Sequence, residues 1–174
     1  MPTIVATPKA ANANSYVTLA AATTYLTDAR LWTSTWIAAT TAIKETALIW
    51  ATMLIDVSFD FPGYITDQDQ ALRWPRSGVV DADGRFVDYD TIPSLIVKAT
   101  CELAAELVKS DRLSTQDILG LGISELKAGP VELKIDPKLI LPFIPAHIIS
   151  MLATIAELKS SAQQGSRVVK LIRT

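Results

Sequence analysis

The chain has 174 residues, the length of one ordinary domain with a core of its own. Hydrophobic residues make up 49% of it and charged residues 20%, which excludes an intrinsically disordered chain. The formal net charge of −2 argues against a protein whose whole surface binds phosphates, because such proteins carry a clear basic excess.

The location of the protein is constrained by three further features. No apolar run reaches the roughly eighteen residues of a membrane span, and the N-terminus lacks the pattern of a signal peptide. Cys101 is the only cysteine, which excludes an internal disulfide and a cysteine-based zinc cluster. We therefore expect folding in a reducing cytoplasm.

The mean hydropathy of +0.29 predicts that some apolar surface is buried against partners.

The first half of the chain predicts an arm followed by helices. Residues 1–16 are small, polar and interrupted by prolines, which indicates an extended arm. A helical domain is expected over 17–160, and Thr18 is the predicted N-cap of its first helix. A second helix, 41–58, is predicted to be central because its apolar residues recur at helical spacing. Its predicted buried face contains Ile43, Ala47, Leu48, Trp50, Ala51, Leu54 and Ile55.

The second half alternates hairpins and helices. Residues 59–70 form a predicted loop, and a hairpin near 78–88 is expected to close on an Asp-Gly turn. A third helix follows Pro93, and a second hairpin is predicted near 122–136. A last helix is predicted over 146–162 and a C-terminal arm over 161–174. The expected fold is mainly α: a bundle of about four helices with one or two short hairpins and two extended arms.

The segment "ALRWPRSGVV" stands out from the Ala- and Leu-rich chain around it. Arginine beside tryptophan can stack on bases and pair with phosphates, but acidic residues flank this segment on both sides. Tryptophan before proline also keeps the chain extended and anchors a bend on the core. We interpret Trp74, Pro75, Arg76 and Gly78 as a structural corner.

The acidic run "DADGRFVDYD" invites a calcium hypothesis through Asp81, Asp83, Asp88 and Asp90. An EF-hand loop needs glycine at its sixth position and glutamate at its twelfth. Counted from Asp81, glycine is fourth and Ile92 is twelfth. We predict an acidic turn, and the sequence does not settle whether a cation binds there.

Catalytic groups are scarce. His147 is the only histidine and lies near Pro145 at the start of an apolar helix, where a packed or surface role is expected. Cys101 has no neighbouring motif that would activate a thiolate. We predict no catalytic residue, no metal and no cofactor, and therefore no enzyme.

The end of the chain, "RVVKLIR", combines β-prone and basic residues behind a Gly-Ser joint. It suits strand addition to the edge of a partner's sheet, and it equally suits a frayed tail or an edge strand of its own domain. Its residues are Arg167, Val168, Val169, Lys170, Leu171, Ile172 and Arg173.

Four segments, "NANSYVTLAAATTYL", "ALRWPRSGVVDADG", "IPSLIVKATCELA" and "AGPVELKID", occur in this order. Together they resemble a tailed-phage family of head-to-tail adaptor (connector) proteins that is often labelled DnaT-like single-stranded DNA-binding. The resemblance covers residues 12 to about 135, and its most specific part is the Trp-Pro-Arg stretch.

The resemblance implies a virion neck protein, made in the bacterial host cytoplasm, that forms a dodecameric ring beneath the portal protein. The ring would contact the next neck or tail protein and leave a channel for double-stranded DNA, without sequence-specific contact and without a membrane partner. A terminal arm docks on the portal in such rings, and residues 167–173 fit that role by their composition. The alternative is a single-stranded DNA-binding accessory protein.

Overall fold

The computed structural model describes residues 2–81, 83–110, 125–128, 131–134 and 144–159, with the backbone alone for the two ranges 125–128 and 131–134. The helices of this part are α1 (Leu19–Ala29), α2 (Ser34–Ala38), α3 (Thr41–Ser58), α4 (Ser94–Lys109) and α6 (Ala146–Leu152). The strands are β1 (Phe59–Asp60), β2 (Tyr64–Ile65), β3 (Arg76–Ser77), β4 (Glu125–Ala128), β5 (Val131–Lys134) and β6 (Glu157–Leu158). They pair as three two-stranded antiparallel sheets, β1 with β6, β2 with β3 and β4 with β5.

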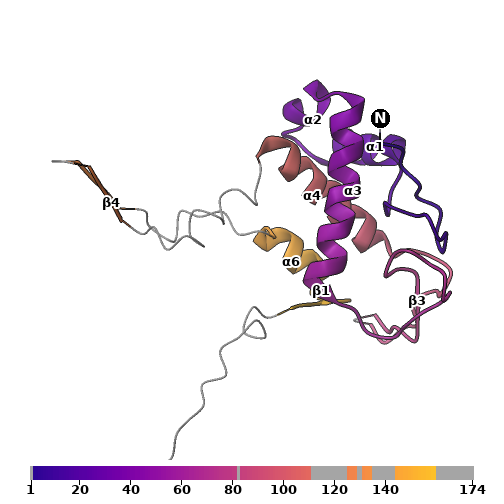
Figure 1. Cartoon of the computed structure of the whole chain (residues 1–174). Coiled ribbons are helices and arrows are strands. Elements are labelled where there is room, and N and C mark those ends of the chain that lie inside the picture. The colour runs from indigo at the N-terminus through magenta and orange to yellow at the C-terminus, as the bar shows by residue number, and fades with distance from the viewer. Residues whose placement is uncertain (1, 82, 111–124, 129–130, 135–143, 160–174) are drawn as a thin grey trace, which may run out of the picture.

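The expected mainly α bundle with short hairpins is confirmed. Helix α3 stands in the middle of Figure 1, and α4 passes behind it. Helix α4 packs chiefly on α3 and also contacts α1, α2 and α6, so it is the common partner of the bundle. Within the described residues, no helix combines the length and the apolar character needed to cross a membrane.

Side-chain caps set where two of the helices begin. The Thr18 side chain accepts a hydrogen bond from the Ala21 backbone, as predicted, and Thr40 does the same for Ile43. Helix α4 begins directly after Pro93. Proline has no backbone N–H, so Pro93 itself adds no unpaired donor at the start of the helix.

The outward face of α3 differs from the prediction. Ala47, Ala51 and Leu54 are buried, but Ile43 is 50% exposed and Trp50 is 38% exposed. Both were predicted to lie in the core. Apolar residues occur around most of this helix, so the periodicity alone does not identify the side that faces α4.

The last helix is shorter than predicted. Helix α6 ends at Leu152, and the chain then turns and pairs β6 with β1. Lys159 N donates to Ser58 O at 2.8 Å and so continues this pairing. Ile155 and Ala156 are buried in the turn. Over residues 153–159, the strand pairing and the burial of the turn together replace the predicted helix, whereas residues 160–162 lie outside the described part of the chain.

The hairpin predicted near 78–88 is short. Val80 and Phe86 form one antiparallel bridge, and Val87 N donates to Val79 O at 2.9 Å. Gly84 has a φ of +79° at the turn, a conformation that glycine adopts without strain. The second hairpin consists of β4 and β5, within the range predicted for it.

The two arms are described to different extents. Residues 2–16 have no helix or strand. Tyr16 is buried, and its backbone N donates to Thr52 Oγ1 of α3 at 3.2 Å. Asn14 accepts from Val5 N at 2.8 Å, so this segment closes on itself. The predicted C-terminal arm, 161–174, lies outside the described residues.

Candidate functional site

The Trp-Pro corner is packed into the core. Trp74 is 1% exposed and meets Phe61 edge to face, with ring centroids 5.8 Å apart. The peptide bond to Pro75 is cis, and Gly78 has a φ of +73°. The indole of Trp74 is therefore buried and is not available for stacking on a nucleotide base.

Arg76 is occupied by the protein's own backbone. Its guanidinium donates to Pro62 O at 2.7 Å, to Gly63 O at 2.6 Å and to Arg73 O at 3.2 Å. Burial lowers the pKa of this side chain. The arginine thus ties the loop before β2 to the corner, and it does not present a free positive charge.

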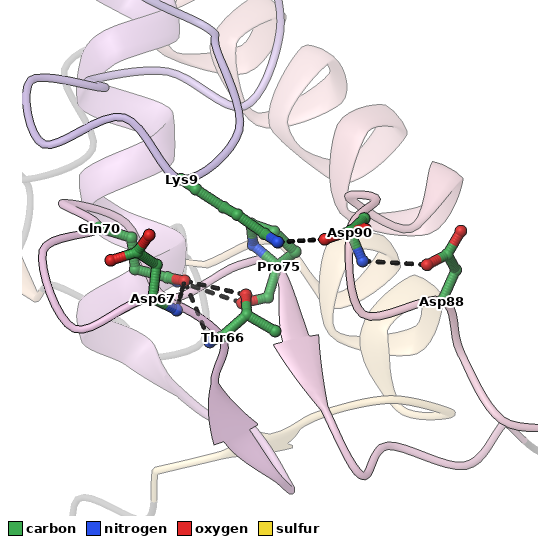
Figure 2. Close-up of polar contacts among 7 residues, drawn as sticks. All are labelled: Lys9, Thr66, Asp67, Gln70, Pro75, Asp88 and Asp90. Atoms are coloured by element: carbon green, nitrogen blue, oxygen red, sulfur yellow. Dashed lines mark hydrogen bonds and ion pairs between the residues drawn. The ribbon is translucent and has the colours of Figure 1, made fainter.

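A second set of contacts fixes the loop between β2 and the corner (Figure 2). Gln70 Oε1 accepts from Thr66 N at 3.1 Å and from Asp67 N at 3.0 Å, and Gln70 Nε2 donates to Pro75 O at 3.1 Å. Figure 2 also shows Lys9 paired with Asp90, which links the N-terminal segment to the loop before α4.

A buried carboxylate joins three parts of the chain. Tyr16 OH donates to Asp56 Oδ1, and Arg73 N donates to Asp56 Oδ2 at 3.2 Å. Burial raises the pKa of Asp56 above its ordinary value, although both hydrogen bonds act in the opposite direction. Burial also raises the pKa of Tyr16, so the hydroxyl stays protonated and keeps donating.

The acidic run forms a turn. Asp81 Oδ1 accepts from Asp83 N at 2.9 Å and from Arg85 N at 2.8 Å, and the Arg85 side chain pairs with both carboxylates. Hydrogen bonding from the Arg85 backbone lowers the pKa of Asp81. Across the residues that the structure describes, no three His, Cys, Asp or Glu side chains gather as a metal site.

Cys101 and His147 lie in different environments. Cys101 is buried in α4, and burial raises the pKa of its thiol to about 12, so it is protonated at neutral pH. His147 is exposed on α6.

Ion pairs engage many of the described basic side chains. Arg30 Nη1 lies 2.9 Å from Glu102 Oε2, and its Nη2 lies 2.6 Å from Glu106 Oε1. Lys109 also contacts Glu106, and Lys159 lies 3.6 Å from Asp60. With Lys9 and Arg85 paired as well, these cations are matched by carboxylates of the same chain.

An apolar surface lies along α3, where the sequence predicted core. Its four members are spaced by seven, three and four residues: Ile43, Trp50, Met53 and Val57, which are 50%, 38%, 42% and 60% exposed. With Thr46 included, the residues are separated alternately by three and four positions. This spacing is typical of the side of a helix that packs against another helix. We call these five residues the α3 face.

The α3 face widens into a groove near the C-terminal end of α4. The groove has a volume of about 370 Å³ and is lined by Ala42, Ile43, Thr46, Ala47, Trp50, Leu107 and Val108. No charged side chain lines it. The charged residues of α3, Lys44, Glu45 and Asp56, are not members of the α3 face.

The structure therefore separates the residues that the sequence singled out. Trp74, Pro75 and Arg76 are held by contacts within the chain and Gly78 provides a positive φ beside them, whereas residues 167–173 lie outside the described part of the chain. Sequence reasoning missed the α3 face. Its signal was present, because apolar residues recur at three-four spacing on a second side of the same helix.

The fold and surface define a small, mainly α protein with short antiparallel hairpins and an exposed apolar helix face. A protein-family model described as "Putative DnaT-like ssDNA binding protein" matches residues 1–174. The chain belongs to this DnaT-like family. No curated protein and no solved structure matches it.

Proposed function

We propose that the protein is a structural adaptor of a tailed-phage neck that acts through assembly. It forms a dodecameric ring beneath the portal protein, contacts the next neck or tail protein, and leaves a channel for double-stranded DNA. It is made in the host cytoplasm and ends in the virion. The observation that carries this proposal is the uncharged, exposed α3 face and the groove beside it.

The apolar surface is large enough to matter for association. Burial of apolar area contributes about 25 cal/mol per Å². The exposed parts of the α3 face and of the apolar side chains around α2 supply an area on the order of the ~800 Å² that one partner gives to a standard interface. Surfaces of this kind on a soluble chain mark protein contacts.

The ion pairs support the second half of the proposal, a channel through which DNA passes without being retained. DNA affinity comes mainly from lysines and arginines that neutralise phosphates. Here Arg30, Arg85 and Lys109 are already matched by carboxylates of the same chain. A wall of such pairs gives the moving duplex little net attraction.

Portal docking is assigned to residues 167–173, on the β-prone and basic composition of that segment. A chain that lacks residues 165–174 is expected to stay folded and to fail to join purified portal rings in a co-sedimentation assay. Normal joining by the truncated chain would rule out this docking segment.

A second candidate function is single-stranded DNA binding. The family description favours it, and so do exposed aromatic side chains that are able to stack on bases: Trp32, Tyr64, Phe86 and Tyr89. Fluorescence anisotropy with a labelled single-stranded oligonucleotide, in a salt series, separates the two functions. The adaptor predicts weak binding throughout. Tight binding by the isolated chain that falls steeply with salt would establish the alternative and contradict the adaptor.

A further inference from the structure

The turn between α1 and α2 presents two of the three most exposed large apolar side chains that the structure describes. Leu31 is 92% exposed and Trp32 is 81% exposed. Ile37, in α2, is 59% exposed. We call these three residues the knob. Trp32 does not occupy the groove of its own chain, because its side chain remains almost wholly exposed.

The knob is held in place on both sides. Arg30, the residue before it, is bound by Glu102 and Glu106 of α4. Trp36, which lies between Trp32 and Ile37, is 1% exposed, and Lys44 of α3 donates to Ile37 O at 3.4 Å. The exposed side chains therefore project from a fixed backbone, which lowers the entropy lost when they are bound.

The groove on α3 and α4 has the properties of a receptor for such side chains. Its lining is apolar apart from Thr46, and its volume of about 370 Å³ falls within the ~300–1,000 Å³ of pockets that enclose small ligands. An indole ring is smaller than such ligands. Neither the knob nor the groove carries a charge, so two copies of this chain meet there without repulsion.

We propose that the knob of one copy occupies the α3–α4 groove of the next copy. This inference rests on the proposed assembly function and names its contact. The two surfaces are different, so the contact is head-to-tail, and every copy is bound on both sides. Repetition of such a contact gives a closed ring when the rotation between copies closes.

The presence of both surfaces on one chain favours a second copy as the occupant. A tryptophan buries about 150–250 Å² when it enters a pocket. In a head-to-tail contact the knob belongs to one copy and the α3 face to the next, so the two exposed surfaces are the two sides of one interface. One chain carries both halves, so no other protein is needed to cover either surface.

Single-cysteine cross-linking in the full chain tests the pairing. Ser34 is exposed beside the knob, and Thr46 is exposed in the groove, so Ser34→Cys and Thr46→Cys label the two surfaces. The native Cys101 does not interfere, because it is buried and its thiol pKa is about 12. The two variants are mixed and treated with a short bismaleimide reagent. Ser94→Cys, an exposed serine at the start of α4, replaces Ser34→Cys in the matched control.

The expected product is a dimer between the Ser34→Cys and Thr46→Cys chains, in large excess over either homodimer and over the Ser94→Cys control. Adding Trp32→Ser to the Ser34→Cys chain should remove the excess. A product in which Thr46→Cys chains join one another would show a symmetric α3 contact and overturn the proposal. An unlinked mixture, or one that matches the control, would overturn it too.

The portal assay reports on a different step. Cross-linking of the knob to the groove without portal joining would leave this contact standing and remove the adaptor function. Portal joining without the cross-link would do the reverse.

Discussion

Trp74 and Trp32 occupy opposite kinds of environment. Trp74 is 1% exposed and sits in a corner where the Arg76 guanidinium donates to three backbone carbonyls of the same chain. Trp32 is 81% exposed on a fixed turn, with no core around it. The conspicuous segment of the sequence is thus packed into the core, whereas the exposed apolar side chains lie on and beside helices of ordinary composition.

The largest expected effect is at the corner. Trp74→Ala empties a packed site against Phe61 and is expected to lower the free energy of unfolding by about 3–5 kcal/mol. Urea denaturation of the purified variant measures this change. A loss of less than about 1 kcal/mol would mean that the corner is not part of the core.

Substitution of two glycines by alanine distinguishes the cost of a steric clash from the cost of backbone strain. Gly63 has a φ of +72°, and an added Cβ would clash with the Ser77 carbonyl oxygen of β3. Gly84 has a φ of +79° and open space around it. Gly84→Ala should cost about 1–2 kcal/mol from backbone strain alone. Gly63→Ala should cost clearly more, and equal losses in thermal unfolding would contradict the described β2–β3 contact.

The buried carboxylate gives the corner a pH dependence. The pKa of Asp56 is raised above 3.8 in the folded state, so the stability that this group contributes is fully present below 3.8. It is lost as the pH rises through the folded pKa. Urea unfolding of the wild type and of Asp56→Asn is measured in a pH series that starts below 3.8. The wild type should lose stability relative to the variant as the pH increases. A relative gain with rising pH would show that the ionised form is the one stabilised by Tyr16 and Arg73.

The smallest expected effect is at the knob. Trp32→Ser removes an exposed side chain and is expected to change the free energy of unfolding by less than about 0.5 kcal/mol. The same urea assay that is used for Trp74→Ala measures it. A loss comparable to that of Trp74→Ala would show that Trp32 packs within its own chain.

The fold was predictable where signals are local. Thr18, Pro93 and the Asp83-Gly84 pair mark ends and turns through their own chemistry, and the structure uses them in that way. The end of α6 was not predictable in this way. Ile155 fits a continued helix as well as a turn, and the choice depends on β1, which lies far away in the sequence.

The surface was harder to predict for the same reason. Periodicity showed that α3 is apolar, but only the position of α4 determines that Trp50 faces outward. The match of Arg30 with Glu102 and Glu106 joins residues more than seventy positions apart, which no local pattern encodes. The net charge therefore predicted a nearly neutral surface, but it did not indicate which basic side chains form ion pairs with which carboxylates.

The most direct test of the central claim is sedimentation velocity of the full chain over a concentration series. The wild type and the Thr24→Arg control, an exposed threonine of α1, should sediment as multi-subunit species at high concentration. Thr46→Arg places a charge in the groove and should remain monomeric with an unchanged melting temperature. A wild type that stays monomeric at every concentration, or a Thr46→Arg variant that assembles like it, would contradict assembly through the α3–α4 groove.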